Sequence, residues 1–341
     1  MFVGIHVSNR QWRDPQISSG DLSLLRLMAP GVWSVKMMSY HRLSAWRSVD
    51  AILHPALWLV RLNDLSDLPN LATIHDAGYL AVAVEVGNEP NNPIEPWRAN
   101  INLWAQWFDE ATCWLREHCP AWAIATPGLS PTFDLDGWLT HPAFRGRAAQ
   151  AHQVCAHGYY HDSITEAIEQ VHKVQQRYPG KPILVSECCC TIGEQGPPRP
   201  TTTLAREYVE IAQRLAALGI EAVYYYILGS DDPYWERVGE TFDETMARAL
   251  GAIRIGGTTV DKLEAALRDI WQRQGVIPPA DDGFWKYALA QAQAGKLVYP
   301  LPSKDGNWQN YDDPIYVRAL TVPPLWAKKG EWTVHEGFPP F

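Results

Sequence analysis

Short runs of apolar residues recur along the first three quarters of the chain, and amphipathic stretches separate them. The runs are rich in Val, Ile, Leu and aromatic residues, which is typical of strands buried on both faces of a parallel sheet. They predict eight strands, over residues 2–7, 32–38, 58–62, 80–86, 122–125, 153–156, 183–186 and 222–228.

The amphipathic stretches predict helices. In residues 97–118 the apolar positions recur every three or four residues, which places them on one helical face. Residues 163–177 repeat this pattern and are followed by Pro179 and Gly180, which end a helix. Residues 203–218 show it again before Gly219.

Eight β-then-α units predict an α/β protein, a (β/α)₈ TIM barrel spanning residues 1–256. A doubly wound open sheet is the alternative, but it usually has fewer strands and a glycine-rich first turn. The sequence contains no GxGxxG and no Walker A motif, so no nucleotide site is predicted.

Gly256 and Gly257 interrupt the alternation. Residues 257–341 are therefore predicted to form a small C-terminal appended region, either a helical and irregular extension or an accessory module. Helices are expected over residues 260–273 and 284–294, with brief strand-like pieces after Gly295.

Composition and net charge limit the binding partners and the cellular compartment that we expect for this protein. The chain of 341 residues has a formal net charge of −9, which disfavours nucleic acid because an acidic protein repels the phosphate backbone. No apolar run is long enough for a membrane helix, and no signal peptide is recognisable at the N-terminus. Three of the six cysteines are consecutive, which is unlike a secreted disulfide framework, so we expect a cytoplasmic protein. Oligomeric state is left open.

Two glutamates lie where predicted strands end. Glu89 follows the fourth strand and Glu187 follows the seventh. Catalytic groups of a TIM barrel lie at the carboxyl ends of its strands, and strands four and seven face each other across the ring. A pair of carboxyl groups across a cleft is what glycoside hydrolysis requires, one as acid and one as nucleophile or base.

The arrangement of Asn88-Glu89-Pro90 after strand four, with Glu187 at strand seven, resembles the retaining glycoside hydrolases of clan A, which use a (β/α)₈ barrel. The resemblance covers about residues 1–255. It implies that Glu89 is the acid/base and Glu187 the nucleophile, and that Asn88 binds the sugar 2-hydroxyl.

Further positions are assigned by the same resemblance. His157 and Tyr159 follow strand six, where the clan has a His or Tyr that touches the nucleophile, and Arg61 is expected to orient it. The clan often has Trp at the end of strand eight, but this chain has Tyr226 there, so Tyr226 or Trp235 is expected to stack on the sugar. His6, at the end of strand one, is expected either to contact the sugar or to pack.

The predicted function is thus hydrolysis of O-glycosidic bonds in an oligo- or polysaccharide, with retention and without a cofactor or metal. The alternative is a carbohydrate-binding barrel without turnover. A metal-dependent hydrolase is disfavoured, because the sequence lacks clustered His and Asp ligands at strand ends. Adjacent Cys188, Cys189 and Cys190 also lack the spacing of zinc ligands. Asp231 and Asp232 are expected in a solvated loop.

Overall fold

The computed structural model describes most of the chain. It covers residues 1–7, 17–29, 31–194, 197–230, 234 and 241–253, together with four short strands between Val298 and Glu336. The chain divides into two compact units, Met1–Ile255 and Gly256–Phe341.

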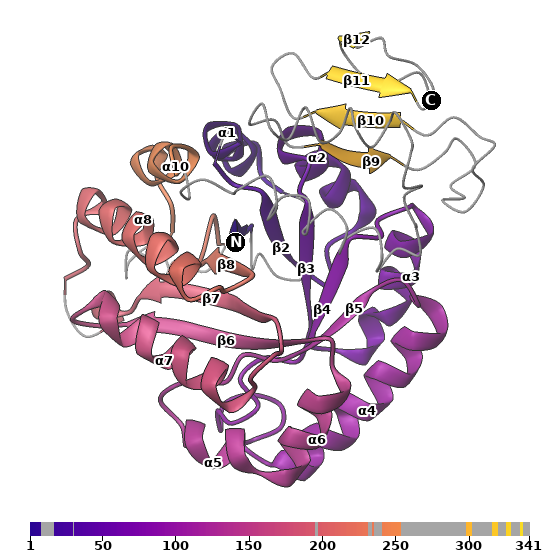
Figure 1. Cartoon of the computed structure of the whole chain (residues 1–341), viewed down its shortest axis with the longest axis vertical. Helices are drawn as coiled ribbons and strands as arrows, with labels where there is room; N and C mark the ends of the chain where they lie inside the picture. Colours follow the sequence, from indigo (N-terminus) through magenta and orange to yellow (C-terminus); the bar gives the residue numbers. More distant parts are fainter. Residues whose placement is uncertain are drawn as a thin grey trace. The chain divides into compact units, whose positions relative to one another are not determined.

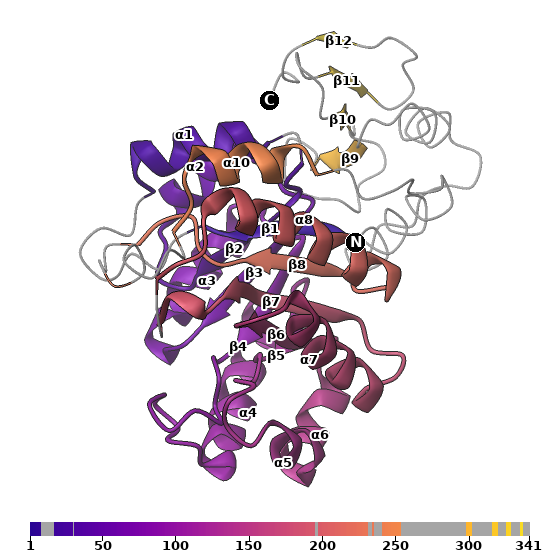
Figure 2. The ribbon, with the colours of Figure 1, turned by 90° about the vertical axis from the view of Figure 1, so that its left-hand side faces the viewer.

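The first unit is a closed barrel of eight parallel strands in the order β1-β2-β3-β4-β5-β6-β7-β8 (Figures 1 and 2). Strands β1 and β8 pair directly and close the ring. The prediction of a TIM barrel is confirmed. The strands are β1 (Phe2–His6), β2 (Ser34–Met38), β3 (Leu57–Leu62), β4 (Val82–Val86), β5 (Ala123–Thr126), β6 (Gln153–Tyr160), β7 (Ile183–Cys190) and β8 (Ala222–Tyr225).

Helices lie outside the ring of strands (Figure 1). They are α1 (Ser19–Met28), α2 (Leu43–Leu53), α3 (Leu68–Asp76), α4 (Ile101–His118), α5 (Leu135–Thr140), α6 (Pro142–Gln150), α7 (Ile164–Arg177), α8 (Thr201–Ala217) and α10 (Glu244–Gly251), with short 3₁₀ turns η1 (Leu65–Asp67) and η2 (Ile192–Glu194). The prediction that the fourth helix starts at Trp97 is wrong. It starts at Ile101, because the Asn100 side chain accepts hydrogen bonds from the first helical amides.

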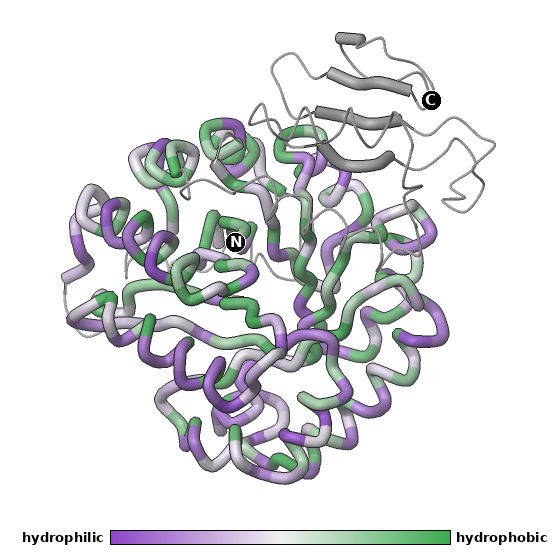
Figure 3. The backbone as a smooth tube through the Cα atoms, in the orientation of Figure 1, coloured by the Kyte–Doolittle hydropathy of each residue, from purple (hydrophilic) through white to green (hydrophobic). Residues whose placement is uncertain are grey.

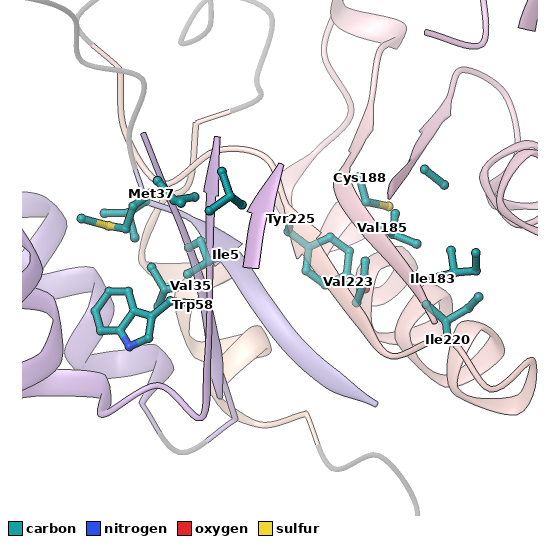
Figure 4. Packing of buried hydrophobic residues seen from close by; sticks show 14 of the residues in the cluster. Ile5, Val35, Met37, Trp58, Ile183, Val185, Cys188, Ile220, Val223 and Tyr225 are labelled. Atoms are coloured by element: carbon teal, nitrogen blue, oxygen red, sulfur yellow. The ribbon is translucent and has the colours of Figure 1, made fainter. Parts of the chain in front are cut away.

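Alternate strand residues face two different cores. Residues such as Val35, Trp58 and Val223 point outward and pack beneath the helices (Figure 4). Figure 3 shows the corresponding hydrophobic strands at the centre of the unit. The inward positions form a smaller cluster that includes Leu59, Ala83, Leu184 and Tyr224. This inner cluster fills the barrel below the ends where chemistry is expected.

Strands β6 and β7 are longer than predicted and carry an irregularity. Ala156 pairs with Val185, but the next residue, His157, pairs with Glu187. Strand β7 has the same extra residue against β8. Ser186 is therefore a bulge, and bulges commonly redirect side chains next to active sites. Glu187 lies inside β7 rather than after its end.

The second unit contains a four-stranded antiparallel sheet in the order β12-β11-β10-β9. Its strands are β9 (Val298–Leu301), β10 (Tyr316–Ala319), β11 (Leu325–Lys328) and β12 (His335–Glu336). The helices predicted over 260–273 and 284–294 lie outside the described residues, as do Trp235, Asp231 and Asp232. Within the described ranges, every helix is too short or too polar to cross a bilayer.

Candidate active site

The uppermost inward residues of the barrel are polar and charged. At this level β2 supplies Lys36, β3 supplies Arg61, β4 supplies Glu85 and β6 supplies His157, and all four are buried. Parallel strands end on the same rim of a barrel, so residues far apart in sequence meet there. Glu89 and Glu187 join this group, and each retains a small exposed fraction, 8% and 5%.

A tight turn after β4 positions Glu89. Gly87 has φ 102°, which favours glycine, and Glu89 itself has φ 38°. The Glu89 amide donates to the Gly128 carbonyl at 3.0 Å, which fixes the turn against the loop after β5. Asn91 strengthens that connection through its amide nitrogen, which donates to the Ser130 carbonyl at 2.8 Å. An uncommon backbone conformation is thus held by neighbouring hydrogen bonds.

In the described part of the chain, two side chains form hydrogen bonds with the Glu89 carboxylate. His157 Nδ1 lies 2.9 Å from Oε1, and the Asn92 amide donates to Oε2 at 3.1 Å. Burial alone would raise the pKa of Glu89, but the hydrogen bond and charge of His157, with the Asn92 bond, outweigh it and lower that pKa. The carboxylate of Glu89 is therefore stabilised in its ionised form in the free protein.

The Glu187 carboxylate has a different set of partners. The Tyr159 hydroxyl donates to Oε2 at 2.5 Å. Oε1 forms an ion pair with the Arg61 guanidinium, and Lys36 Nζ lies 3.3 Å from the same oxygen. The His6 ring is also close, with Nδ1 3.7 Å from Oε1. Two cations and a hydroxyl favour an ionised, fixed Glu187, which is the state a nucleophile needs.

Strand β6 connects the two glutamates. His157, which contacts Glu89, is the register partner of Glu187 on β7. Two residues later, Tyr159 donates to Glu187, and after burial the largest cause of its raised pKa is the charge of Glu89. The two carboxylates therefore face one shared group of side chains. His157 contacts Glu89, and Tyr159 is the β6 residue that touches Glu187.

The other predicted residues lie around this pair. The Asn88 amide donates to Glu95 Oε1 at 2.8 Å, while its buried Oδ1 atom has no hydrogen-bond partner among the residues that the structure describes. Tyr226 is 7% exposed and packs edge-on against His6, with ring centroids 5.1 Å apart. His6 is fully buried, and its pKa is well below the usual value because of burial and the cations Lys36 and Arg61.

Sequence reasoning missed Lys36, Glu85 and Glu95. Lys36 and Glu85 each interrupt an apolar strand at a position that faces the barrel interior. A charged residue inside a predicted buried strand was the available signal, because charges are almost never fully buried unless paired. Glu95 gave no comparable signal, since it follows the strand in a loop.

The three consecutive cysteines do not converge. Cys188 and Cys190 belong to the outer core beneath the helices, whereas Cys189 packs with Tyr226 and Ile227. Side chains alternate along a strand, so neighbouring thiols point to opposite faces. Across the described part of the chain, no group of three or more His, Cys, Asp or Glu side chains is arranged to hold a metal ion.

Comparison with known proteins gives likeness in fold only. No protein-family model and no curated protein matches the sequence. Solved structures do match. An endo-β-1,3-glucanase of family GH128 from Sorangium cellulosum superposes with a TM-score of 0.52 at 12% identity, over 75% of this chain and 100% of that one. The GH5_4 protein ZgEngAGH5_4 gives a TM-score of 0.50 at 11% identity, over 74% and 96%. Both structures share the barrel with this chain.

Proposed function

We propose that the protein is a retaining glycoside hydrolase in which Glu187 is the nucleophile and Glu89 the acid/base. One observation carries the proposal. Two carboxylates, one from β7 and one from the loop after β4, share one site but have different partners. Glu187 is paired with Lys36 and Arg61. Glu89 is bonded instead to His157 and Asn92. Different partners of this kind separate the roles of two catalytic carboxyl groups.

The proposed reaction has two steps. First, the Glu187 carboxylate attacks C1 of the sugar, the bond from C1 to the leaving oxygen breaks, and Glu89 gives that oxygen a proton. Second, a water attacks C1, Glu89 takes the water proton, and the electron pair of the ester bond returns to Glu187. Tyr159 and Arg61 hold Glu187 in place for both steps.

The first step needs a proton on Glu89, whose pKa is lowered in the free protein. We infer that the pair of His157 and Glu89 holds this proton in common. His157 Nδ1 and Glu89 Oε1 lie 2.9 Å apart, so a proton on His157 Nδ1 can pass to Glu89 while both side chains stay in place.

The lowered pKa of Glu89 also favours a second candidate function, a carbohydrate-binding barrel without turnover. A Glu89 that stays ionised has no proton for the leaving oxygen, and a shared fold does not transmit activity. The two candidates differ in one measurable way. Binding without product, after long incubation with each member of a substrate panel, identifies the second.

The test is a panel of aryl glycosides and polysaccharides. It begins with β-1,3-glucan, because proteins of this fold include a β-1,3-glucanase, and it includes β-1,4-glucan for comparison. Glu187→Ala is expected to abolish turnover, and Glu89→Gln to lower kcat/KM on unactivated substrates by about 10²–10⁴-fold. Glu110→Gln, on the exposed face of α4, is the matched control. NMR of the first-formed anomer tests retention, and full activity of Glu187→Ala would refute the proposal.

A further inference from the structure

Two buried charged residues near Glu187 form or break no bond in the two steps above. Lys36 on β2 and Glu85 on β4 both have 0% exposure. Their strands bring them to the inner face of the barrel, between the apolar interior and the two catalytic candidates. Burying charges is costly unless each has a partner, so their contacts indicate what they do.

Lys36 joins β4 to the bulge of β7. Its ammonium lies 2.7 Å from Glu85 Oε2 and 3.3 Å from Glu187 Oε1, and it donates to the Ser186 carbonyl at 3.0 Å. An ammonium has three donors, and here three acceptors surround it. Lys36 thus contacts the carbonyl of the bulged residue Ser186 and the carboxylate of Glu187. The Ser186 backbone sets the direction of the Glu187 side chain.

Glu85 holds Lys36 and the bulge from the other side. Its Oε1 accepts from the Ser186 hydroxyl at 2.5 Å and from the Gly128 amide at 3.1 Å. Its Oε2 faces Lys36 and, at 3.4 Å, Arg61 Nε. Burial alone would raise the pKa of Glu85, but the charge of Lys36, the interaction with His157 and the charge of Arg61 lower it well below its usual value. Glu85 is therefore an anion with partners on both oxygens.

We propose that Lys36 and Glu85 are positioning residues for the nucleophile: Glu85 fixes the Lys36 ammonium and the Ser186 bulge, and Lys36 orients the Glu187 carboxylate and keeps it ionised. This inference rests on the proposed function. It explains why two ions lie inside the barrel where apolar residues would fill the space.

The charge balance around Glu187 predicts that Lys36 also affects the second step of the reaction, in which water releases the sugar. Lys36 and Arg61 balance Glu85 and Glu187 while Glu187 is ionised. When Glu187 becomes a neutral ester, this balance is lost, and it returns when water releases the sugar and restores the carboxylate. A nearby cation stabilises that departing carboxylate, so Lys36 is expected to accelerate release of the sugar.

The charged state of Lys36 depends on its surroundings. Burial and the Arg61 charge lower the pKa of Lys36 to about 7, and Glu85 acts in the opposite direction. The titratable or charged groups that face Lys36 and Glu85 from the other strands are His6, Arg61, Cys155, His157, Glu187 and Tyr224. Comparisons between variants are therefore made at matched pH across the range.

The test isolates Glu187 by using a leaving group that needs no acid. The probes are the 2,4-dinitrophenyl 2-deoxy-2-fluoro-β-glycosides of cellobiose and laminaribiose. Their inactivation rates report attack by Glu187, and reactivation rates report its release; mass spectrometry confirms the labelled residue. The variants are Lys36→Met and Glu85→Gln, with Ser34→Ala as control. Ser34 lies on the same inner face of β2, and among the described residues its hydroxyl bonds to Leu57 O and Tyr224 OH.

Opposite shifts are expected from the two variants. Lys36→Met removes a cation from Glu187, so the acid limb of inactivation moves up by about one pH unit and reactivation slows about tenfold or more. Glu85→Gln removes an anion, so the acid limb moves down. Damage to folding alone would not give shifts of opposite sign. Ser34→Ala is expected to keep the wild-type acid limb of inactivation and the wild-type reactivation rate.

The outcomes separate the two hypotheses. A wild-type protein that neither turns over the panel nor becomes labelled at Glu187 refutes the proposed function, and this inference with it. If the wild type is active and both variants keep its acid limb of inactivation and its reactivation rate, this inference alone is refuted. If Lys36→Met does not fold, the shift of Glu85→Gln decides, because an unmoved limb in that variant also overturns the proposal.

Discussion

Replacing Gly128 by alanine tests how closely His157 must lie to Glu89. A Cβ atom at Gly128 would lie 2.1 Å from His157 Cδ2 and 2.3 Å from Nε2. Carbon atoms in contact need about 3.5 Å, so the His157 ring or the Gly128 backbone must move by roughly 1.4 Å. The Gly128 carbonyl accepts from the Glu89 amide, so either movement is expected to break the bond between His157 Nδ1 and Glu89, now 2.9 Å.

The magnitude follows from this displacement. A misplacement of about 1 Å near the chemistry can cost about 10²-fold, so kcat/KM is expected to fall by about that factor. Overpacking also lowers the free energy of unfolding, by about 1–3 kcal/mol. Without its His157 bond, Glu89 is left with the burial that raises its pKa. The alkaline limb of kcat/KM, which reports loss of the acid's proton, should therefore move to higher pH.

The assay is the pH dependence of kcat/KM on the best substrate of the panel, with urea unfolding of the same samples. Gly146→Ala is the matched control, because a Cβ built there meets no described atom within 4 Å apart from its chain neighbours and its own helix backbone, and the residue is exposed on α6. That variant should be as active as wild type and slightly more stable. A Gly128→Ala protein with the wild-type rate and pH profile would show that contact between His157 and Glu89 is not needed.

Two further predictions concern the same cluster. Tyr159→Phe removes the 2.5 Å bond to Glu187, and since a bond to a charged group contributes about 1.5–3 kcal/mol, kcat should fall about 10–100-fold with little change in KM; an unchanged kcat would contradict this. Stability should also depend on pH. Glu85 and Glu89 have lowered pKa values, so their contribution is complete above the ordinary value of 4.5 and is lost as pH falls through the folded-state values. Urea unfolding between pH 3 and 7 measures this, and a free energy of unfolding that stays constant below pH 4.5 would refute it.

The sequence alone determined the barrel and the two candidate glutamates. Eight apolar runs separated by amphipathic stretches leave few folds that bury every run, and a closed ring of parallel strands is one of them. Strand ends are recognisable where an apolar run meets polar residues, so Glu89 and Glu187 could be found by position. The apolar pattern did not give the start of the fourth helix, because it already begins at Trp97, before the helix that Asn100 caps.

Only the tertiary structure decided how those residues are used. The bulge at Ser186 depends on pairing with β6 and β8, and it turns both Ser186 and Glu187 inward. The contact of His157 with Glu89 requires Gly128 from a third strand end. Lys36 and Glu85 are stable inside the barrel because they meet each other from different strands. Periodicity along one chain segment tells which side of its strand a residue faces, whereas charge pairing depends on which strands become neighbours.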